Sequence, residues 1–509
     1  MQTAKPLCGA MLRTQGMNLV DDQGRRVFLS GINLVHKGTR LPGGGFDFYA
    51  NWDENVYQRL ADMGLNVLRF GILWAAMEPR PGEYDMDYFA YVKREMDKAA
   101  RCGLSVILDM HQDLYAQRIA DGAPDWAVLT EEPFEKTELW SDAYLFSSAV
   151  QQCWDRFWEN ARPAGSQKGL QEHYADLWKQ IAGYFGGHPA LLGYDILNEP
   201  APGSEIRGMF ALVLENLAGL LKEEEIKALG LETLSAEALT EVFVSPEKKL
   251  LALEVLNDKE RYKALGELCK EPVIAFEREK LAPFYSRVAA AIRSTDRDSF
   301  ILRGNNYMSN IGIPSGIEPI TVDGQPDPKQ IFAPHGYDLT VDTPAIEVAS
   351  DSRAGSIFAR HRETQQRLGL PTIAGEWGAF GESGVALRHG RYLLKLFDGY
   401  GWGNAYWCFE DGMFDYPSFK LLKRTRPLLL SGEARKLSWD ADEGVFELVW
   451  QEDEGIKADS LLFVHGQPLS IELDGAALDT AGIRDKRLAL PFKGGQRRLL
   501  LRFPAGASC

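Results

Sequence analysis

Short apolar segments alternate with amphipathic helical segments eight times along most of the chain. Near-continuous apolar runs are typical of strands buried in a parallel sheet. Eight strand–helix units in succession predict a closed (β/α)8 barrel, in which the C-terminal ends of all strands open at one face. We expect the barrel strands at residues 27–35, 66–72, 104–111, 191–199, 299–304, 330–337, 371–377 and 404–409.

The pattern changes near residue 424. Beyond it, short segments of alternating polarity are separated by Gly, Asp and Pro, which predicts an antiparallel β-sandwich. We therefore expect a barrel domain at 1–424 and a sandwich domain at 425–509. Charged, Leu-rich helical segments at 203–272 form an insertion directly after the fourth strand. This insertion is either a lid or lipid-facing wall beside the site, or a peripheral helical decoration.

Composition excludes several classes of protein. The net charge of −16, without a dense basic cluster, argues against nucleic acid as a partner. The six cysteines are scattered and show no metal-ligand spacing, so we expect reduced thiols and neither a metal nor another cofactor. The N-terminus lacks the apolar core of a secretory signal, and no apolar run approaches the ~20 residues of a membrane span. We expect a cytoplasmic protein, or a secreted one whose signal is missing from this sequence.

Polar or aromatic side chains lie in or just after almost every predicted strand. The fourth strand leads into Asn198 and Glu199, and Pro200 then has no N–H to continue a ladder. Any one such group alone has a plausible structural role, but ten at one barrel rim predict a site, because buried polar groups are costly unless paired. The other eight are Lys37, Arg69, His111, Asp113, His335, Tyr337, Glu376 and Trp407.

Two carboxylates from different strands suit glycoside hydrolysis. One protonates the leaving oxygen, while the other attacks the anomeric carbon. We expect Arg69 to keep Glu376 ionised and Tyr337 to hydrogen-bond to it. A charged Glu376 then favours the protonated form of Glu199. If the enzyme retains anomeric configuration, the two carboxyl groups lie ~5 Å apart.

The remaining rim residues have supporting roles in this interpretation. We expect His335 to tune the acid. Asn198 is expected to hold the sugar 2-hydroxyl, where hydrogen bonds strengthen in the transition state. Trp407 offers a flat floor for a pyranose ring.

These residues in combination resemble the signature set of glycoside hydrolase family 5. The resemblance spans the barrel and implies a (β/α)8 fold and retention of anomeric configuration. It is carried by Arg69, His111, Asn198-Glu199-Pro200, His335-Gly336-Tyr337, Glu376 and Trp407.

A closer similarity is to endoglycoceramidases and related microbial glucosylceramidases, which carry a C-terminal β-sandwich. It rests on Lys37, the stretch 109–113, the stretch 375–378 and Arg426-Pro427. The similarity implies that Lys37 and Asp113 contact the non-reducing sugar, that Glu199 is the acid/base and that Glu376 is the nucleophile. The implied substrate is a β-glucosyl or oligosaccharyl lipid, and contact with a membrane or micelle surface is a further expectation.

Three alternatives stay open at this point. The first is a cellulase-like or mannanase-like endoglycosidase that acts on polysaccharide. The second is a β-glucosidase for other glucosides with an apolar aglycone. The third, a carbohydrate-binding barrel without activity, requires that one of the two glutamates be missing or turned away. An apolar gutter on the leaving-group side favours a lipid substrate, whereas a long polar groove lined by aromatic residues favours polysaccharide.

Overall fold

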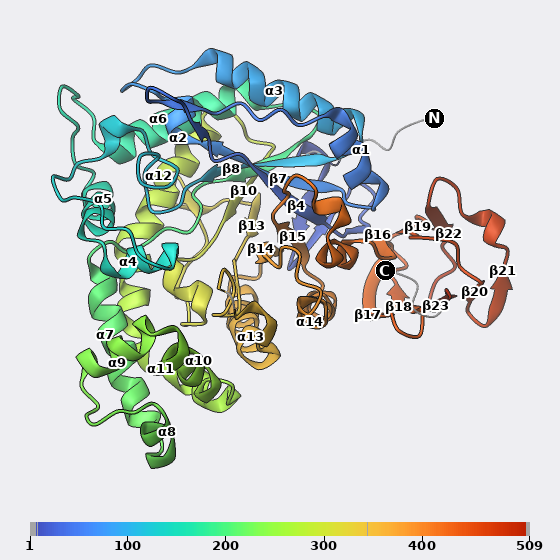
Figure 1. The fold of residues 1–509 in the computed structure, drawn as a ribbon. Coiled ribbons are helices and arrows are strands. Elements are labelled where there is room, and N and C mark those ends of the chain that lie inside the picture. Colours follow the sequence, from blue (N-terminus) through green and yellow to red (C-terminus); the bar gives the residue numbers. More distant parts are fainter. Residues whose placement is uncertain (1–6, 8, 344, 505–509) are drawn as a thin grey trace.

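In the computed structural model, eight parallel strands form a ring at the centre of the molecule (Figure 1). Residue 7, residues 9–343 and residues 345–504 are described. Single bridges from Phe332 to Thr372 and from His335 to Glu376 join the sixth strand to the seventh. The predicted (β/α)8 barrel is confirmed. Its strands are β4 (Ser30–Val35), β7 (Val67–Leu73), β8 (Ser105–His111), β9 (Leu191–Asp195), β10 (Phe300–Arg303), β13 (Gln330–Phe332), β14 (Ile373–Gly378) and β15 (Gly403–Trp407).

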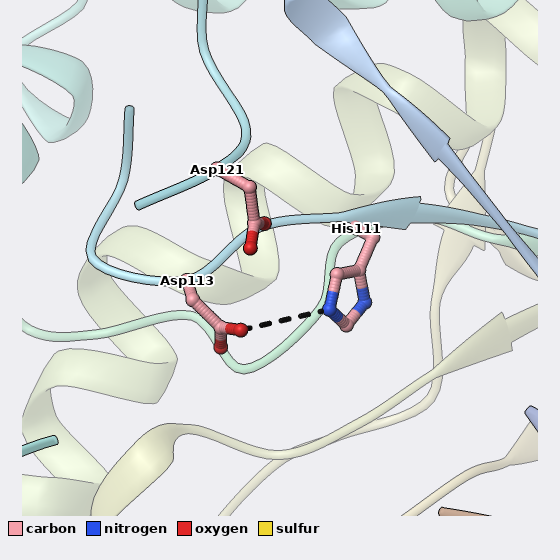
Figure 2. Close-up of side chains that lie close together, drawn as sticks. All are labelled: His111, Asp113 and Asp121. Carbon is pink, nitrogen blue, oxygen red and sulfur yellow. Dashed lines mark ion pairs between the residues drawn. The ribbon is translucent and has the colours of Figure 1, made fainter. Parts of the chain in front are cut away.

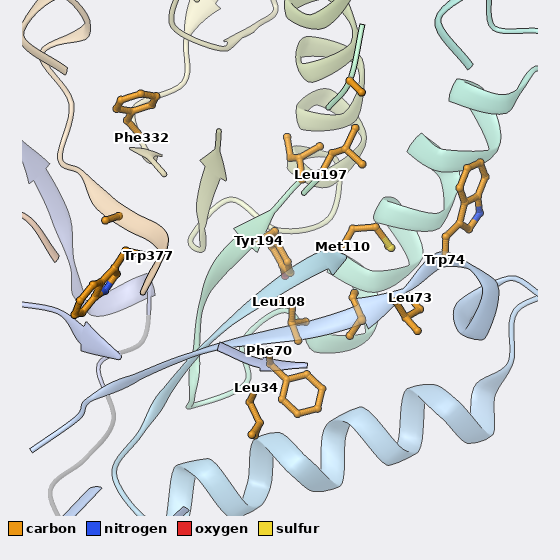
Figure 3. Packing of buried hydrophobic residues seen from close by; sticks show 14 of the residues in the cluster. Leu34, Phe70, Leu73, Trp74, Leu108, Met110, Tyr194, Leu197, Phe332 and Trp377 are labelled. Carbon is orange, nitrogen blue, oxygen red and sulfur yellow. The ribbon is translucent and has the colours of Figure 1, made fainter. Parts of the chain in front are cut away.

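Helices surround this ring, and their ends follow from local chemistry. The Asp85 carboxylate accepts the first free N–H groups of α3, and Gly369 ends α13 in a left-handed conformation. Buried apolar side chains of the strands and helices pack together (Figure 3). The helices are α1 (Glu54–Asp62), α2 (Trp74–Met77), α3 (Met86–Arg101), α4 (Ala143–Phe146), α5 (Ser148–Trp158), α6 (Leu170–Phe185), α12 (Ala282–Arg293), α13 (Asp351–Leu368) and α14 (Ala386–Tyr400).

Two barrel strands end well before their predicted ends, by four and five residues. β9 ends at Asp195 rather than at Glu199, and β13 ends at Phe332 rather than at residue 337. Beyond β9 the backbone leaves the regular ladder, and Glu199 has a φ of 41°, which a strand does not accommodate. The two predicted ends are therefore wrong, because an apolar run continues through irregular backbone above the strands.

The helical insertion after β9 contains α7 (Glu205–Leu220), α8 (Glu223–Ala228), α9 (Ala236–Val244), α10 (Pro246–Val255) and α11 (Lys259–Phe276). It stands beside the barrel, coloured green in Figure 1. α11 continues through a π-helical turn, η4 (Glu277–Leu281), into α12. α11 thus extends past residue 272, where the charged, Leu-rich stretch ends, to Phe276. Among the described residues, no helix has the length and apolarity needed to cross a membrane.

Two antiparallel sheets form the C-terminal region. Their facing sides enclose a second core, which includes Phe446, Trp450 and Leu501. One sheet contains β16 (Arg426–Leu430), β19 (Ser460–Phe463) and β22 (Arg487–Leu490), and the other contains β17 (Gly432–Asp440), β18 (Val445–Glu452), β20 (Ser470–Leu473), β21 (Ala476–Leu478) and β23 (Gln496–Arg502).

Three N-terminal strands extend the first of these sheets, which the sequence pattern did not indicate. They are β1 (Arg13–Gln15), β2 (Asn18–Val20) and β3 (Arg26–Val27), and β3 pairs with β16. The division of the chain at residue 424 stays a prediction. Two small hairpins complete the fold: β5 (Thr39–Arg40) with β6 (Phe46–Asp47), and β11 (Thr321–Val322) with β12 (Gln325–Pro326).

The described cysteines bear on the expectation of reduced thiols. Cys102, Cys153, Cys269 and Cys408 are all free. The remaining two, Cys8 and Cys509, lie outside the described residues.

Candidate active site

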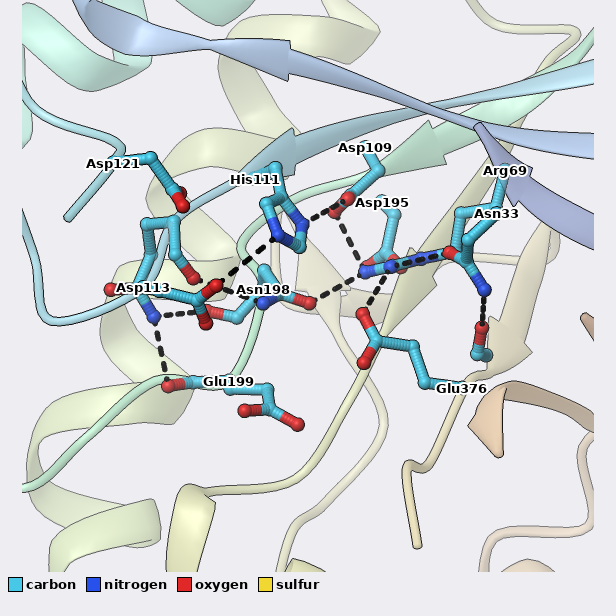
Figure 4. Close-up of polar contacts among 12 residues, drawn as sticks. Asn33, Arg69, Asp109, His111, Asp113, Asp121, Asp195, Asn198, Glu199 and Glu376 are labelled. Carbon is cyan, nitrogen blue, oxygen red and sulfur yellow. Dashed lines mark hydrogen bonds and ion pairs between the residues drawn. The ribbon is translucent and has the colours of Figure 1, made fainter. Parts of the chain in front are cut away.

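A buried arginine holds three carboxylates together inside the mouth of the barrel. Arg69 of β7 is 1% exposed and donates to Glu376 Oε1 at 2.7 Å, Asp109 Oδ1 at 2.7 Å and Asp195 Oδ2 at 2.9 Å (Figure 4). The same guanidinium donates to Asn198 Oδ1 at 2.9 Å. Because the guanidinium presents its donors in a rigid fork, it fixes four groups at once, from β8, β9, β14 and the segment that follows β9.

Glu376 has the two partners expected from the sequence. Arg69 binds Oε1, and the Tyr337 hydroxyl donates to Oε2 at 2.8 Å. The pKa of Glu376 nevertheless lies above its ordinary value, because burial outweighs the opposing fields of His335 and Arg69. Arg69 also forms ion pairs with Asp109 and Asp195, so its positive charge stabilises the ionised form of Glu376 less than an unshared arginine would.

Glu199 lies opposite Glu376 in a different environment. Its Oε1 accepts from Asn310 Nδ2 at 3.0 Å and lies 3.0 Å from His335 Nδ1. Burial, followed by the negative charge of Asp113, raises the pKa of Glu199 to about 7. Burial lowers the pKa of His335, so this imidazole is neutral at neutral pH. Glu199 therefore keeps its proton up to near neutral pH.

The spacing of the two carboxyl groups matches a retaining mechanism. One oxygen of Glu199 and one of Glu376 lie within 4.8 Å of each other, and His335 Nδ1 lies 3.0 Å from Glu199 and 3.5 Å from Glu376. Carboxyl groups ~5–5.5 Å apart are typical of retaining glycosidases, whereas inverting enzymes separate them by ~6.5–9.5 Å to admit a water.

A charged cluster forms one wall beside the carboxylates. The Lys37 ammonium forms ion pairs with Asp113 and, at 3.4 Å, with Asp121. It also lies 5.2 Å from the ring centroid of Trp407. Burial raises the pKa of Asp121 to about 6, with Lys37 acting against this. For Asp113, the fields of Lys37 and His111 outweigh burial and hold its pKa below the usual range.

His111 joins this cluster to the arginine. Its Nδ1 lies 2.9 Å from Asp109 Oδ2, and its ring stacks on Trp407 with centroids 5.1 Å apart. Burial disfavours the charged imidazolium, but the hydrogen bond to Asp109 and the nearby carboxylate of Asp113, 3.8 Å from Nε2, outweigh burial and raise the pKa of His111 to about 10. Among the described residues, no group hydrogen-bonds to its buried Nε2, so this donor is available to a ligand hydroxyl.

Two groups of side chains have the geometry of metal ligands. His111, Asp113 and Asp121 offer ligand atoms within 4.8 Å of one another (Figure 2), and Glu199, His335 and Glu376 do the same. In the first group, the Lys37 ammonium already supplies a positive charge to both aspartates. In the second, His335 and the glutamates contact one another directly.

All ten predicted site residues meet at the barrel mouth, but others that contact them were not predicted. Asp121 lies in a loop and Asn310 in a short 3-10 turn, and neither segment has a periodic pattern, so no local signal identifies them. Gln112 follows His111 directly, and its amide donates to the carbonyl oxygens of Asn198 at 2.9 Å and Glu199 at 3.2 Å. Its position after an apolar strand is the one signal that the sequence offered.

A cavity of about 340 Å³ contains both carboxylates and changes character along its length. Around Glu199 and Glu376 its walls are polar and aromatic. Beyond them, the insertion supplies a mostly apolar wall from α7, α10 and α11. The lining residues of this wall include Phe210, Val213, Leu217, Leu253, Leu256, Tyr262 and Leu265.

A (β/α)8 barrel with two carboxylates at this spacing across its mouth has the architecture of a two-acid glycoside hydrolase. The family model for cellulase (glycosyl hydrolase family 5) matches residues 20–229 and 237–412. The chain belongs to this family.

Similar proteins extend this result. An endoglycoceramidase from Cyanea nozakii is 31% identical over 215 residues, which cover 37% of this chain and 41% of that protein. The chain thus spans about two fifths of the curated relatives it matches. Endo-glycoceramidase II from Rhodococcus sp., solved as a ganglioside GM3 complex, is 23% identical with a TM-score of 0.70. The match covers 96% of this chain and 100% of that one. Its lactosyl-enzyme intermediate is 24% identical with the same TM-score, covering 96% and 99%.

Proposed function

We propose that this protein is a retaining β-glycosidase that hydrolyses the bond between a sugar and a lipid aglycone. The observation that carries this proposal is a single cavity that joins two closely spaced carboxylates to an apolar wall. The resemblance to endoglycoceramidases in sequence and to endo-glycoceramidase II in fold supports the same substrate class.

Each carboxylate has a defined step in the proposed mechanism. Glu376 attacks the anomeric carbon and forms a glycosyl-enzyme ester, while Glu199 donates its proton to the departing oxygen. Glu199 then removes a proton from water, which hydrolyses the ester and restores both groups. The environments favour this division, since Arg69 and Tyr337 donate one to each oxygen of Glu376, whereas no cationic group of the described residues lies as close to Glu199.

The other rim residues bind the sugar in this proposal. His111 Nε2 and Asn198 face the glycone from the Arg69 side, and Trp407 packs against a pyranose face. Lys37 and Asp113 recognise hydroxyl groups further from the scissile bond. His335 lies between the two glutamates and supports the protonated acid without itself carrying a charge.

The apolar wall separates the lipid proposal from the polysaccharide alternative. A second polysaccharide segment on the leaving-group side requires hydrogen-bonding partners for its hydroxyl groups. Val213, Leu217 and Leu253 provide none. They match the methylene groups of a lipid chain, whose burial contributes about 0.8 kcal/mol per CH₂. A β-glucosidase acting on other apolar-aglycone glucosides fits the same wall.

We also propose that the cavity opens toward a membrane or micelle surface. Trp140 and Phe146 line the cavity, yet 39% and 36% of their surfaces stay exposed. Exposed aromatic side chains at the entrance to an apolar cavity lower the cost of transferring a lipid from an aggregate. Co-sedimentation with neutral phosphatidylcholine vesicles should fall in Phe146→Ser, and equal binding by both proteins argues against this contact.

The function is tested by incubating the protein with glucosylceramide, lactosylceramide, an aryl β-glucoside and cello-oligosaccharides. We expect release of glucose or lactose from the glycolipids, and the released sugar distinguishes removal of one glucose from removal of the whole glycan. Cleavage of cello-oligosaccharides without cleavage of either glycolipid contradicts the proposal.

The apolar wall has its own test. Val213 is half-buried on α7 and lines the cavity, so Val213→Asp places a charge where the lipid is expected. We expect at least tenfold lower kcat/KM on glucosylceramide and little change on an aryl β-glucoside, because burying an unpaired carboxylate is costly. Gly208→Asp is the matched control, since it adds the same charge to an exposed position of α7. Equal losses on both substrates contradict this role for the wall.

A further inference from the structure

A loop amide outside the ten predicted residues contacts Glu199. Asn310 lies in η5 (Tyr307–Ile311), the 3-10 turn that follows β10, and its side chain is 8% exposed. Its Nδ2 donates to Glu199 Oε1 at 3.0 Å, and His335 Nδ1 contacts the same oxygen. Among the described residues, no hydrogen bond reaches Glu199 Oε2, so the two oxygens of this carboxyl group are not equivalent.

This asymmetry has a chemical consequence. An oxygen that accepts a hydrogen bond from an amide N–H is the poorer site for the acidic proton. The proton of Glu199 is therefore favoured on Oε2, which is the oxygen left to donate. Since Glu199 lines the cavity together with Glu376, this oxygen is available to the leaving group of a bound glycoside.

The turn that carries Asn310 is anchored by a second, fully buried carboxylate. Glu277 is 0% exposed and begins the π-helical turn between α11 and α12. It accepts from Asn306 Nδ2 at 2.7 Å, Ser315 Oγ at 2.8 Å and Gly316 N at 2.6 Å. Asn306 in turn caps η5, because its Oδ1 accepts from Met308 N at 2.8 Å.

This contact chain links the helical insertion to the acid. Glu277 follows α11, whose residues Tyr262 and Leu265 line the apolar part of the cavity. π-Helical turns are rare and often occur at functional sites. Burying a carboxylate costs free energy unless its oxygens accept hydrogen bonds. Glu277 is therefore stable in this position only because Asn306, Ser315 and Gly316 all donate to it.

We propose that Asn310 is a positioning residue that directs the proton of Glu199 toward the leaving-group oxygen, and that Glu277 holds Asn310 in place. The inference rests on the proposed glycosidase function, because it concerns the acid step of that reaction. The amide also favours the ionised form of Glu199, since it donates to a carboxylate oxygen. Loss of the amide therefore raises the pKa of Glu199 further.

The test is Asn310→Leu, which removes the donor and keeps a side chain branched at the same carbon. Wild-type protein is first assayed on β-glucosides and β-lactosides, and the sugar that it hydrolyses is used afterwards. The two leaving groups are 2,4-dinitrophenol, which departs without protonation, and an alkyl alcohol, which requires it. If the wild-type protein hydrolyses neither, the glycosidase function fails, and the role of Asn310 fails with it.

We expect Asn310→Leu to lower kcat/KM on the alkyl glycoside by about tenfold or more, within the ~10²–10⁴-fold that general acid catalysis supplies. On the dinitrophenyl glycoside the change should stay within about twofold. The alkaline limb of kcat/KM should move upward by about one pH unit, which is the scale of one charge-assisted hydrogen bond. Equal losses on the two glycosides, or an unmoved alkaline limb, overturn the proposal.

Two further variants separate positioning from general damage. Asn216→Leu makes the same substitution where the amide donates to the Leu212 carbonyl oxygen in the insertion. It should leave both substrates unaffected. Glu277→Gln keeps the shape of the anchor but removes acceptor capacity, and we expect it to reproduce the leaving-group dependence in weaker form. If Glu277→Gln unfolds, Asn310→Asp is decisive. Its negative charge must raise the pKa of Glu199, and so move the alkaline limb of kcat/KM to higher pH, by more than Asn310→Leu does. A smaller rise for Asp than for Leu contradicts the proposal.

Discussion

The strongest structural prediction concerns Arg69. Replacing it with methionine keeps a long apolar stem but removes the only guanidinium that binds Glu376, Asp109 and Asp195 among the described residues. All three carboxylates are at least nine-tenths buried. Arg69→Met therefore leaves three neighbouring buried carboxylates with no guanidinium partner among the described residues.

The expected cost follows from that arrangement. Removing one partner of a buried ion pair typically costs about 3–5 kcal/mol. The variant can reduce the cost by protonating a carboxylate. With an ordinary pKa near 4, this requires about 5 kcal/mol at pH 8 and about 1.4 kcal/mol at pH 5.

The sign of the pH dependence is therefore fixed. Burial already raises the pKa values of Asp195 and Glu376, and without Arg69 these folded-state values rise further above the unfolded ones. A carboxyl group of this kind destabilises the fold increasingly as the pH rises above its unfolded pKa. Relative to wild type, Arg69→Met should lose more stability at pH 8 than at pH 5.

The assay is thermal unfolding of both proteins at the two pH values. We expect the Tm to fall by roughly 3–5 °C at pH 8 and by roughly half of that or less at pH 5. Arg303→Met is a matched control, because Arg303 is equally buried on β10 but its Nε and Nη2 have no hydrogen-bond partner among the described residues. It should change the Tm much less, and equally at both pH values. A loss below about 2 °C for Arg69→Met at pH 8, or a larger loss at pH 5, refutes the reasoning.

The remaining predictions concern the reaction. The kcat/KM of the wild-type protein should fall as the pH rises through about 7, because Glu199 then loses the proton that it must donate. Asp113→Asn should move that limb to lower pH, since the charge of Asp113 contributes to the raised pKa of Glu199. If the limb does not move, the group that titrates in it is not Glu199. Glu376→Gln should reduce turnover at least ~10³-fold while glycolipid binding and Tm are kept, and appreciable residual turnover removes Glu376 from the nucleophile role. Incubation with EDTA should leave kcat unchanged, because two carboxylates and no metal perform the proposed chemistry.

Much of the barrel was predictable because each of its strands is buried on both faces. Leu68, Leu108 and Tyr194 belong to apolar runs that stand out in the sequence, and the helices between them have regular periods. The convergence of Glu199 and Glu376 then follows from topology, since parallel strands open at one face. Where the apolar run outlasted the strand, as after Asp195, the end of the element was misjudged.

Other features depend on long-range contacts that leave no local pattern. Val27 pairs with Leu429 across almost the whole chain, so a strand at residues 26–27 gains its partner only in the folded protein. Asn310 resembles any loop asparagine until the turn capped by Asn306 brings it to Glu199. Asp121 contacts Lys37 through a loop that pairs back with Asp113, two residues beyond β8. Such residues are defined by tertiary structure and not by period or spacing.

The central claim is that Glu376 forms a covalent bond to the sugar. It is tested most directly by reacting the protein with a 2-deoxy-2-fluoro-β-glycosyl fluoride of the sugar that the wild-type protein releases, followed by mass spectrometry of the intact chain and of its peptides. The account predicts a mass increase of one fluoroglycosyl group, located on the peptide that contains Glu376 and absent from Glu376→Gln. A label on Glu199 or on any other residue, or hydrolysis with inversion at the anomeric carbon, contradicts it.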